Sequence, residues 1–150
     1  MPMQFIFLND QIHYKNELIK NVQKYWPESC EWLTNLCDKC YTNRLPAIKI
    51  ALINNQMIGY YVLMHKEYLK KQVSYTPWIS VILIFEPYRK NRYSPLIIED
   101  ACSTLKSFGF NKAYLATSHI QYYEKYNCKE IDIGILEWDE AVKIYVREFT

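Results

Sequence analysis

The segment from Trp78 to Phe85 constrains the fold more than any other part of this sequence. It is almost continuously apolar and is interrupted only by Ser80. An apolar run of this length, preceded by Pro77, is typical of a strand that is covered on both faces. It is far shorter than the roughly 20 apolar residues that a membrane-spanning helix needs. We therefore predict a central strand of a sheet here.

An amphipathic helix is predicted directly after this strand, from Leu96 to Phe108. Its apolar residues recur at intervals of three and four: Ile98, Ala101, Cys102, Leu105 and Phe108. Gly109 stands where a left-handed C-terminal cap is needed. Ser94 is suited to cap the beginning of the helix, and Pro95 is suited to its first position, where a missing N–H costs nothing. Strand, loop and helix thus form one structural unit.

The other apolar patterns predict further strands and helices. Before the central strand we expect a strand at Gln4–Leu8, a helix capped by Asn9 and Asp10 and ended by Pro27, and a second helix with Trp32, Leu33, Leu36, Cys37 and Cys40 on one face. We also expect a hairpin of Ile48–Ile53 with Met57–Met64 that turns at Asn54, Asn55 and Gln56. After Gly109 we expect strands at Ala113–Ala116, Glu130–Leu136 and Val142–Phe149, and a short helix at His119–Tyr126. Lys66–Lys71 is predicted to be an exposed connection. The class is α/β (α+β), with a mixed sheet in one domain spanning residues 1–150.

The charge balance argues against a dedicated nucleic-acid or membrane-surface protein. The 150 residues carry 18 basic and 16 acidic side chains, for a net charge of +2. Such proteins have a one-sided basic excess. RNA contact through the basic segments Arg89–Arg92 and Lys66–Lys71 is a weaker alternative. No basic segment precedes the apolar run Phe5–Leu8, so nothing resembles a secretory signal and we expect a soluble cytoplasmic protein without membrane contact.

The five cysteines favour free thiols in a reducing compartment. They form an odd set without a regular framework: Cys30, Cys37, Cys40, Cys102 and Cys128. Cys37 and Cys40 have C-x-x-C spacing, but two further ligands at similar spacing are missing, and the pair closes an apolar helical stretch instead of opening a helix. We therefore predict core or helix-end cysteines and no metal site.

Three cations crowd the predicted N-terminus of the long helix. Arg89, Lys90 and Arg92 lie at the end where the helix macrodipole disfavours positive charge, by a few tenths to about 1 kcal/mol per group. A bound anion would reverse that sign, because exposed backbone N–H groups and basic side chains together make a phosphate site. The alternative is a solvated basic loop without a ligand.

Other catalytic patterns are absent from the sequence. Its only glycines are Gly59, Gly109 and Gly134, which excludes the glycine-rich loops of dinucleotide- and nucleoside-triphosphate-binding proteins. None of the serines has the sequence setting of a nucleophile elbow, so a serine hydrolase is not expected.

Half of the chain, from the Met57 strand to Cys128, resembles the GCN5-related N-acetyltransferase (GNAT) superfamily. The resemblance rests on the order strand, Tyr88-Arg89-x-x-Arg92-x-Ser94, helix ending in Phe108-Gly109, strand, and Tyr122-Tyr123-Glu124-Lys125-Tyr126. It implies a mixed, mostly antiparallel sheet flanked by about four helices. It also implies that acetyl-CoA is the co-substrate, with its pyrophosphate on the loop residues Arg89, Lys90, Asn91, Arg92, Tyr93, Ser94 and Pro95 and its pantetheine arm along Ile82, Leu83 and Ile84.

The loop departs from the family pattern at two positions. Arg92 and Ser94 stand where the family has small residues, the first of them glycine, which permits close backbone approach and unusual dihedral angles. Arg92 either adds a phosphate contact or blocks the site. The first outcome predicts an N-acetyltransferase, and the second predicts a non-catalytic acyl-CoA-binding or regulatory module on the same fold.

Acetyl transfer needs an acid and a base. The resemblance implies that Tyr123 lies near the cofactor sulfur and protonates the leaving thiolate. A primary amine is mostly protonated at neutral pH and must lose a proton first. Glu86, at the end of the central strand, and His119 are the candidate bases; Glu86 as an ion partner of the adjacent arginines and His119 as a helix cap are the alternatives. The acceptor is an unidentified small-molecule or peptide amine, and the edge of the final strand would allow a homodimer.

Overall fold

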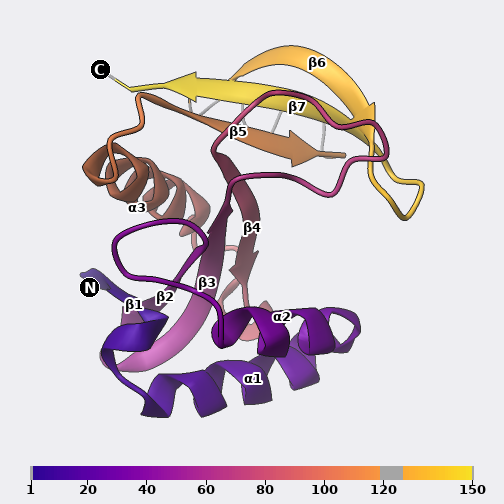
Figure 1. Ribbon diagram of the computed structural model, residues 1–150. Helices are drawn as coiled ribbons and strands as arrows, with labels where there is room; N and C mark the ends of the chain where they lie inside the picture. The colour runs from indigo at the N-terminus through magenta and orange to yellow at the C-terminus, as the bar shows by residue number, and fades with distance from the viewer. Residues whose placement is uncertain (1, 119–126, 150) are drawn as a thin grey trace. The chain divides into compact units, whose positions relative to one another are not determined.

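The computed structural model describes residues 2–118 and 127–149 (Figure 1). The chain forms two compact units, one made of Met1–Val62 and Val81–Asp100 and the other of Leu63–Ser80 and Ala101–Thr150. The strand β4, Trp78–Ile84, and the helix α3, Ser94–Ser107, each contribute residues to both.

The first unit contains a sheet with the strand order β1-β2-β3-β4. Its further elements are β1 (Met3–Phe7), α1 (His13–Tyr25), α2 (Cys30–Cys37), β2 (Ala47–Ile53) and β3 (Gln56–Met64). β1 and β2 are antiparallel, with Met3 opposite Ile53. Asn54 and Asn55, at φ 52° and 63°, make the two-residue turn of the predicted β2–β3 hairpin. α1 and α2 lie side by side (Figure 1) and bury Leu18, Val22 and Leu33 completely.

The cap predicted for α1 is wrong. Asn9 and Asp10 belong to a short 3-10 helix, Leu8–Asp10, and α1 begins at His13 without a side-chain cap. The Asn9 side chain is used elsewhere, because its Nδ2 donates to the Cys40 carbonyl at 2.6 Å and its Oδ1 accepts from Cys40 Sγ at 3.1 Å. A long-range contact has thus replaced the local one.

The second unit contains three antiparallel strands in the order β5-β7-β6: β5 (Lys112–Thr117), β6 (Lys129–Ile135) and β7 (Ala141–Glu148). Within this unit, Trp78 at the beginning of β4 pairs in parallel with Tyr114 of β5. The core comprises Leu69, Trp78, Tyr114, Leu136, Val142 and Ile144.

Two predictions about exposure need correction. The connection Lys66–Lys71 is only partly exposed, because Glu67 and Leu69 retain 7% and 3% of their accessible surface. The central strand is covered less completely than predicted, since Ser80 through Leu83 are half-buried. In the first unit β4 is the last strand of the order, so one of its edges has no strand of that unit beside it.

α3 begins one residue earlier than its predicted cap implied. The Tyr93 carbonyl accepts from the Leu96 and Ile97 amides at 3.0 and 3.2 Å, so Tyr93 is the cap, while Ser94 and Pro95 are the first two helical residues. Pro95 still loses nothing there, because the first helical N–H groups have no intrahelical acceptor. Gly109 has φ 98° and ends the helix as predicted, and the Phe110 amide donates to the Leu105 carbonyl at 3.1 Å.

The mixed, mostly antiparallel sheet confirms the predicted class. Three α-helices are described, and the predicted helix His119–Tyr126 lies outside the described residues. All five cysteines are free thiols. In the part of the chain that the structure describes, no helix has the length and apolar character needed to span a membrane.

Candidate functional site

The loop between β4 and α3 forms the candidate site, and its first half is held by short-range backbone bonds. Glu86–Tyr88 form a 3-10 turn with Pro87 near its beginning, where a missing N–H is tolerated. The Tyr88 amide donates to the Phe85 carbonyl at 2.9 Å, and the Arg89 amide donates to the backbone carbonyl of Glu86 at 3.2 Å. The chain therefore leaves the strand in a defined direction.

The second half of the loop carries free backbone donors. Among the described residues, the N–H groups of residues 90 to 94 have no backbone or side-chain acceptor. Lys90 and Arg92 have φ 70° and 57°, whereas Asn91 between them is not in the left-handed region. Successive amides in such alternating conformations turn their N–H groups toward one side and form an anion-binding concavity. The first turn of α3 adds the positive end of its macrodipole.

The side chains of this loop add positive charge that no acidic side chain of the described residues neutralises. Arg89, Lys90 and Arg92 are exposed, and none of them forms an ion pair with any residue in the two described ranges. Arg89 Nε donates to the Ile84 carbonyl at 2.9 Å, which anchors this side chain beside the end of β4. Asn91 Nδ2 donates to the Tyr88 carbonyl at 2.9 Å and braces the turn. Free amides and unpaired cations fit a pyrophosphate group.

Arg92 adopts the backbone conformation for which the family pattern uses glycine. Its φ of 57° lies in the left-handed region, and its side chain is exposed. A non-glycine residue pays roughly 1–2 kcal/mol for this conformation. The loop therefore keeps a glycine-like backbone at this position without a glycine.

The strand before the loop approaches β3 closely. The Phe85 amide donates to the Ile58 carbonyl at 2.9 Å. A Cβ atom on the buried Gly59 would lie 2.3 Å from the Leu83 carbonyl oxygen. Of the three residues expected to pair with the pantetheine arm, Ile82 and Leu83 are half-buried and Ile84 is buried with its carbonyl bonded to Arg89.

The proposed acid and bases are placed only in part. Glu86 is exposed and makes no ion pair with any described residue, so its interpretation as a partner of the adjacent arginines is wrong. Its role as a base stays a prediction. His119 and Tyr123 lie outside the described residues.

Sequence reasoning missed two carboxylates with distinctive surroundings. Asp100 of α3 accepts from the Tyr61 hydroxyl at 2.6 Å and pairs with Lys49 at 3.0 Å, which fixes α3 to β2 and β3 in the first unit. Glu67 of the second unit is buried, which raises its pKa from 4.5 to about 7. The helical position of Asp100 was visible in the sequence, but no pattern identified its partners. Glu67 is surrounded by exposed lysines in sequence, which concealed its burial.

Comparison with solved structures identifies the fold. The PaiA N-acetyltransferase from Thermoplasma acidophilum in complex with coenzyme A has a TM-score of 0.71 at 17% identity, covering 99% of this chain and 100% of that one. The aminoglycoside 6'-N-acetyltransferase from Enterococcus faecium has a TM-score of 0.73 at 14% identity, covering 99% of this chain and 97% of that one.

A GNAT family acetyltransferase from Elizabethkingia anophelis with acetyl-CoA bound has a TM-score of 0.65 at 16% identity, covering 98% of each chain. No protein-family model and no curated protein matches the sequence. The chain thus has the GNAT fold, as its resemblance to that superfamily predicted.

Proposed function

We propose that the protein is an N-acetyltransferase that moves an acetyl group from acetyl-CoA directly to a primary amine. The observation that carries the proposal is the loop after β4, with five consecutive free amides beside three unpaired cations among the described residues. The fold adds support, because coenzyme A or acetyl-CoA is bound in the solved structures of the Thermoplasma and Elizabethkingia proteins.

The loop residues Arg89 to Pro95 would hold the pyrophosphate of the co-substrate. The amides of residues 90 to 94 would donate to phosphate oxygens, and Arg89, Lys90 and Arg92 would supply charge. Ile82 and Leu83 would lie along the pantetheine arm. Acetyl-CoA supplies an activated thioester, so no covalent enzyme intermediate is needed.

The protein must also manage two protons. The acceptor ammonium, with a reference pKa near 10.4, has to lose one before the nitrogen can attack, and we assign this step to Glu86 or His119. The departing thiolate must gain a proton, and we assign the Tyr123 hydroxyl as its donor. The reaction is then a direct transfer between two substrates.

The acceptor is proposed to be a small-molecule or peptide amine. An aminoglycoside acetyltransferase among the structural neighbours is consistent with a small amine.

We further propose a cytoplasmic location and a homodimer. The prediction that the final strand offers an edge is wrong, because β7 pairs with both β5 and β6. The strand at the end of the order β5-β7-β6 is β6, so we propose its edge for the contact. A non-catalytic acyl-CoA-binding module is the second candidate, because Arg92 and Ser94 replace the small residues of the family loop.

Thermal unfolding with and without coenzyme A tests the proposed site. At a coenzyme A concentration of 100 times Kd, the free energy of unfolding should rise by about 2.7 kcal/mol and Tm by roughly 5–10 °C.

Arg92→Gly keeps the left-handed backbone but removes a cation, and should weaken binding of coenzyme A about fivefold. Asn55→Gly is the matched control, since Asn55 also has a left-handed φ, of 63°, but lies in the β2–β3 turn. Unchanged affinity in Arg92→Gly would contradict the assigned contact, and no binding by the unmodified protein would refute the site.

Tyr123→Phe separates the enzyme from the binding module. Loss of the phenolic proton should lower turnover with an accepted amine by about 10²-fold or more, while coenzyme A affinity stays within about twofold. Unchanged turnover would remove Tyr123 from the mechanism. Coenzyme A binding without turnover of any amine tested would favour the module.

A further inference from the structure

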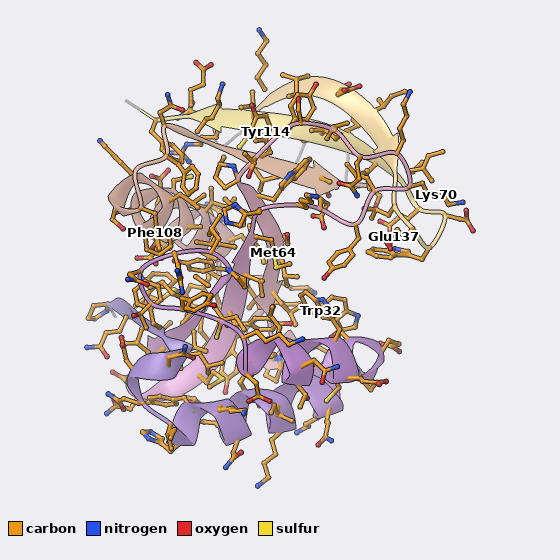
Figure 2. The ribbon with its side chains drawn as sticks, in the orientation of Figure 1. Trp32, Met64, Lys70, Phe108, Tyr114 and Glu137 are labelled. Atoms are coloured by element: carbon orange, nitrogen blue, oxygen red, sulfur yellow. The ribbon has the colours of Figure 1, made fainter. Side chains whose placement is uncertain are left out.

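In the first unit, the backbone groups of β4 are divided between the two edges of the strand. Figure 1 shows β3 beside β4, and Figure 2 adds the side chains of both strands. Directly after β4, the Phe85 amide donates to the Ile58 carbonyl of β3 at 2.9 Å. The Leu83 carbonyl oxygen also lies toward β3, since a Cβ atom on Gly59 would lie 2.3 Å from it. Alternate residues of a strand direct their backbone groups to opposite edges, so Ile84 directs its N–H and C=O away from β3.

That second edge, here called the open edge, has no other strand of the described part of the first unit beside it. Arg89 occupies one of its backbone groups, because its Nε donates to the carbonyl of the buried Ile84 at 2.9 Å. The Arg89 backbone is itself held in place. Its N–H donates to the Glu86 carbonyl at 3.2 Å, and its carbonyl accepts from Asn91 Nδ2 at 3.3 Å. The last carbonyl of the open edge is therefore capped by the protein's own side chain.

The pantetheine arm of acetyl-CoA has the chemistry to pair with such an edge. It contains two secondary amides, each with one N–H donor and one carbonyl acceptor, and an extended chain of this kind adds to a sheet as a further strand does. On the open edge, Ile82 directs both backbone groups outward, whereas the carbonyl of Ile84 is taken by Arg89 and leaves its N–H for a ligand. Leu83 directs its backbone toward β3. The pattern of donors and acceptors that the arm meets thus ends at the Arg89 cap.

We infer that Arg89 is a positioning residue that sets the register of the pantetheine arm on β4. The inference rests on the proposed function. By capping the Ile84 carbonyl, Arg89 withholds this acceptor from the amides of the arm, so the arm pairs with the Ile84 N–H and with Ile82. The register in turn fixes the distance from the pyrophosphate loop at which the thioester lies. This role depends on the place of the Nε donor in the side chain and is separate from the charge that Arg89 supplies to the loop.

Two substitutions at Arg89 separate the cap from the charge. Arginine Nε and glutamine Nε2 are the same number of bonds from Cα, so Arg89→Gln keeps a donor at this point and removes the charge. Arg89→Lys keeps the charge but places a carbon atom at this point, with the ammonium one bond further out. Arg92→Lys is the matched control, because it makes the same exchange at another cation of the same loop.

Calorimetric titration of the whole protein with two ligands measures the effect. Coenzyme A carries pantetheine, and 3'-phospho-ADP is coenzyme A without it, so the ratio of their Kd values reports what the arm contributes to binding. In Arg89→Lys, this contribution should fall at least about fivefold, while the Kd of 3'-phospho-ADP stays within about twofold. In Arg89→Gln, both ligands should bind more weakly by a similar factor, so the ratio should stay within about twofold. Arg92→Lys should also leave the ratio within about twofold.

The two ligands keep this inference apart from the proposed function. An unchanged ratio in Arg89→Lys, an equal fall in Arg89→Gln or in Arg92→Lys, or a ratio near one in the unmodified protein would overturn the inference and leave the loop as a phosphate site. Retained affinity of Arg89→Lys for 3'-phospho-ADP confirms that its loop is folded. Failure of the unmodified protein to bind either ligand would instead count against the proposed function.

Discussion

Glu67→Gln should change how the stability of this protein depends on pH. In the folded state burial holds the pKa of Glu67 at about 7, whereas its ordinary value is 4.5. Between these two values the folded state binds more protons than the unfolded state. The free energy of unfolding therefore falls as pH rises through this window. The stabilising contribution of the neutral carboxyl is complete below pH 4.5 and is lost by about pH 7.

The size of the effect follows from the two pKa values. A difference of roughly 2.5 pH units corresponds to about 3 kcal/mol, at about 1.4 kcal/mol per unit. Glutamine fills the same space without titrating, so Glu67→Gln lacks this loss. Relative to the variant, the unmodified protein should become less stable by about 2–3 kcal/mol between pH 5 and pH 8. That is a large part of the 5–15 kcal/mol typical of a domain.

Urea unfolding at pH 5, 6, 7 and 8 measures this difference directly. Subtracting the two free energies at each pH removes the contribution of every other titrating group, provided that the urea m-value is unchanged. Glu137 is an exposed acid, so the free energy of unfolding of Glu137→Gln should equal that of the unmodified protein at all four pH values. Parallel curves for Glu67→Gln and the unmodified protein would refute the reasoning, because they would mean that Glu67 titrates alike in both states.

Two further substitutions test the packing that supports the loop. Gly59→Ala places a Cβ atom 2.3 Å from the Leu83 carbonyl oxygen, so backbone must move, and we expect a loss of about 1–3 kcal/mol in thermal unfolding. The Asp100 carboxylate pairs with Lys49 at 3.0 Å and accepts from the Tyr61 hydroxyl at 2.6 Å. Asp100→Asn removes its charge and should lower the free energy of unfolding in urea by about 1–3 kcal/mol.

Each substitution has a control in the same chain. At Gly134 the nearest atom to an added Cβ is the flexible side-chain tip of Leu69, at 3.0 Å, so Gly134→Ala should cost clearly less than Gly59→Ala. Equal losses would contradict the close backbone approach. Glu99→Gln changes an exposed acid one residue from Asp100 and should have a smaller effect. If it matches Asp100→Asn, the loss reflects helix charge and not the contacts of Asp100.

Elements with a strong local pattern could be predicted from the sequence. The hairpin turn at Asn54 and Asn55 and the helix end at Gly109 depend on left-handed backbone conformations that asparagine and glycine favour, so residue type alone identified them. The strand at Trp78–Ile84 followed from its apolar run. These features are encoded within a few residues of where they occur.

Features that depend on distant contacts could not be predicted in the same way. Asn9 has the residue type of a helix cap, but its side chain binds Cys40 across the chain. Glu67 lies in a stretch whose composition is that of a solvated loop, and it is buried because residues 68–70 pair with the β6–β7 hairpin. Local composition carries no information about such pairing.

The candidate site lies between these two cases. The basic residues and the helix beginning after Arg92 were visible in the sequence, and they predicted an anion site at the loop between them. The left-handed φ of Arg92 was not visible, since arginine rarely adopts it. Only the structure reveals that the amides of residues 90 to 94 have no acceptor among the described residues.

Amide chemical shifts of the ¹⁵N-labelled protein during titration with coenzyme A test the central claim most directly. If the loop holds the pyrophosphate, the N–H signals of residues 90 to 94 should move most, because each gains an anionic acceptor. The amides of Asn54 and Asn55 in the β2–β3 turn should stay in place. Binding of coenzyme A that leaves the signals of residues 90 to 94 unchanged would contradict the account.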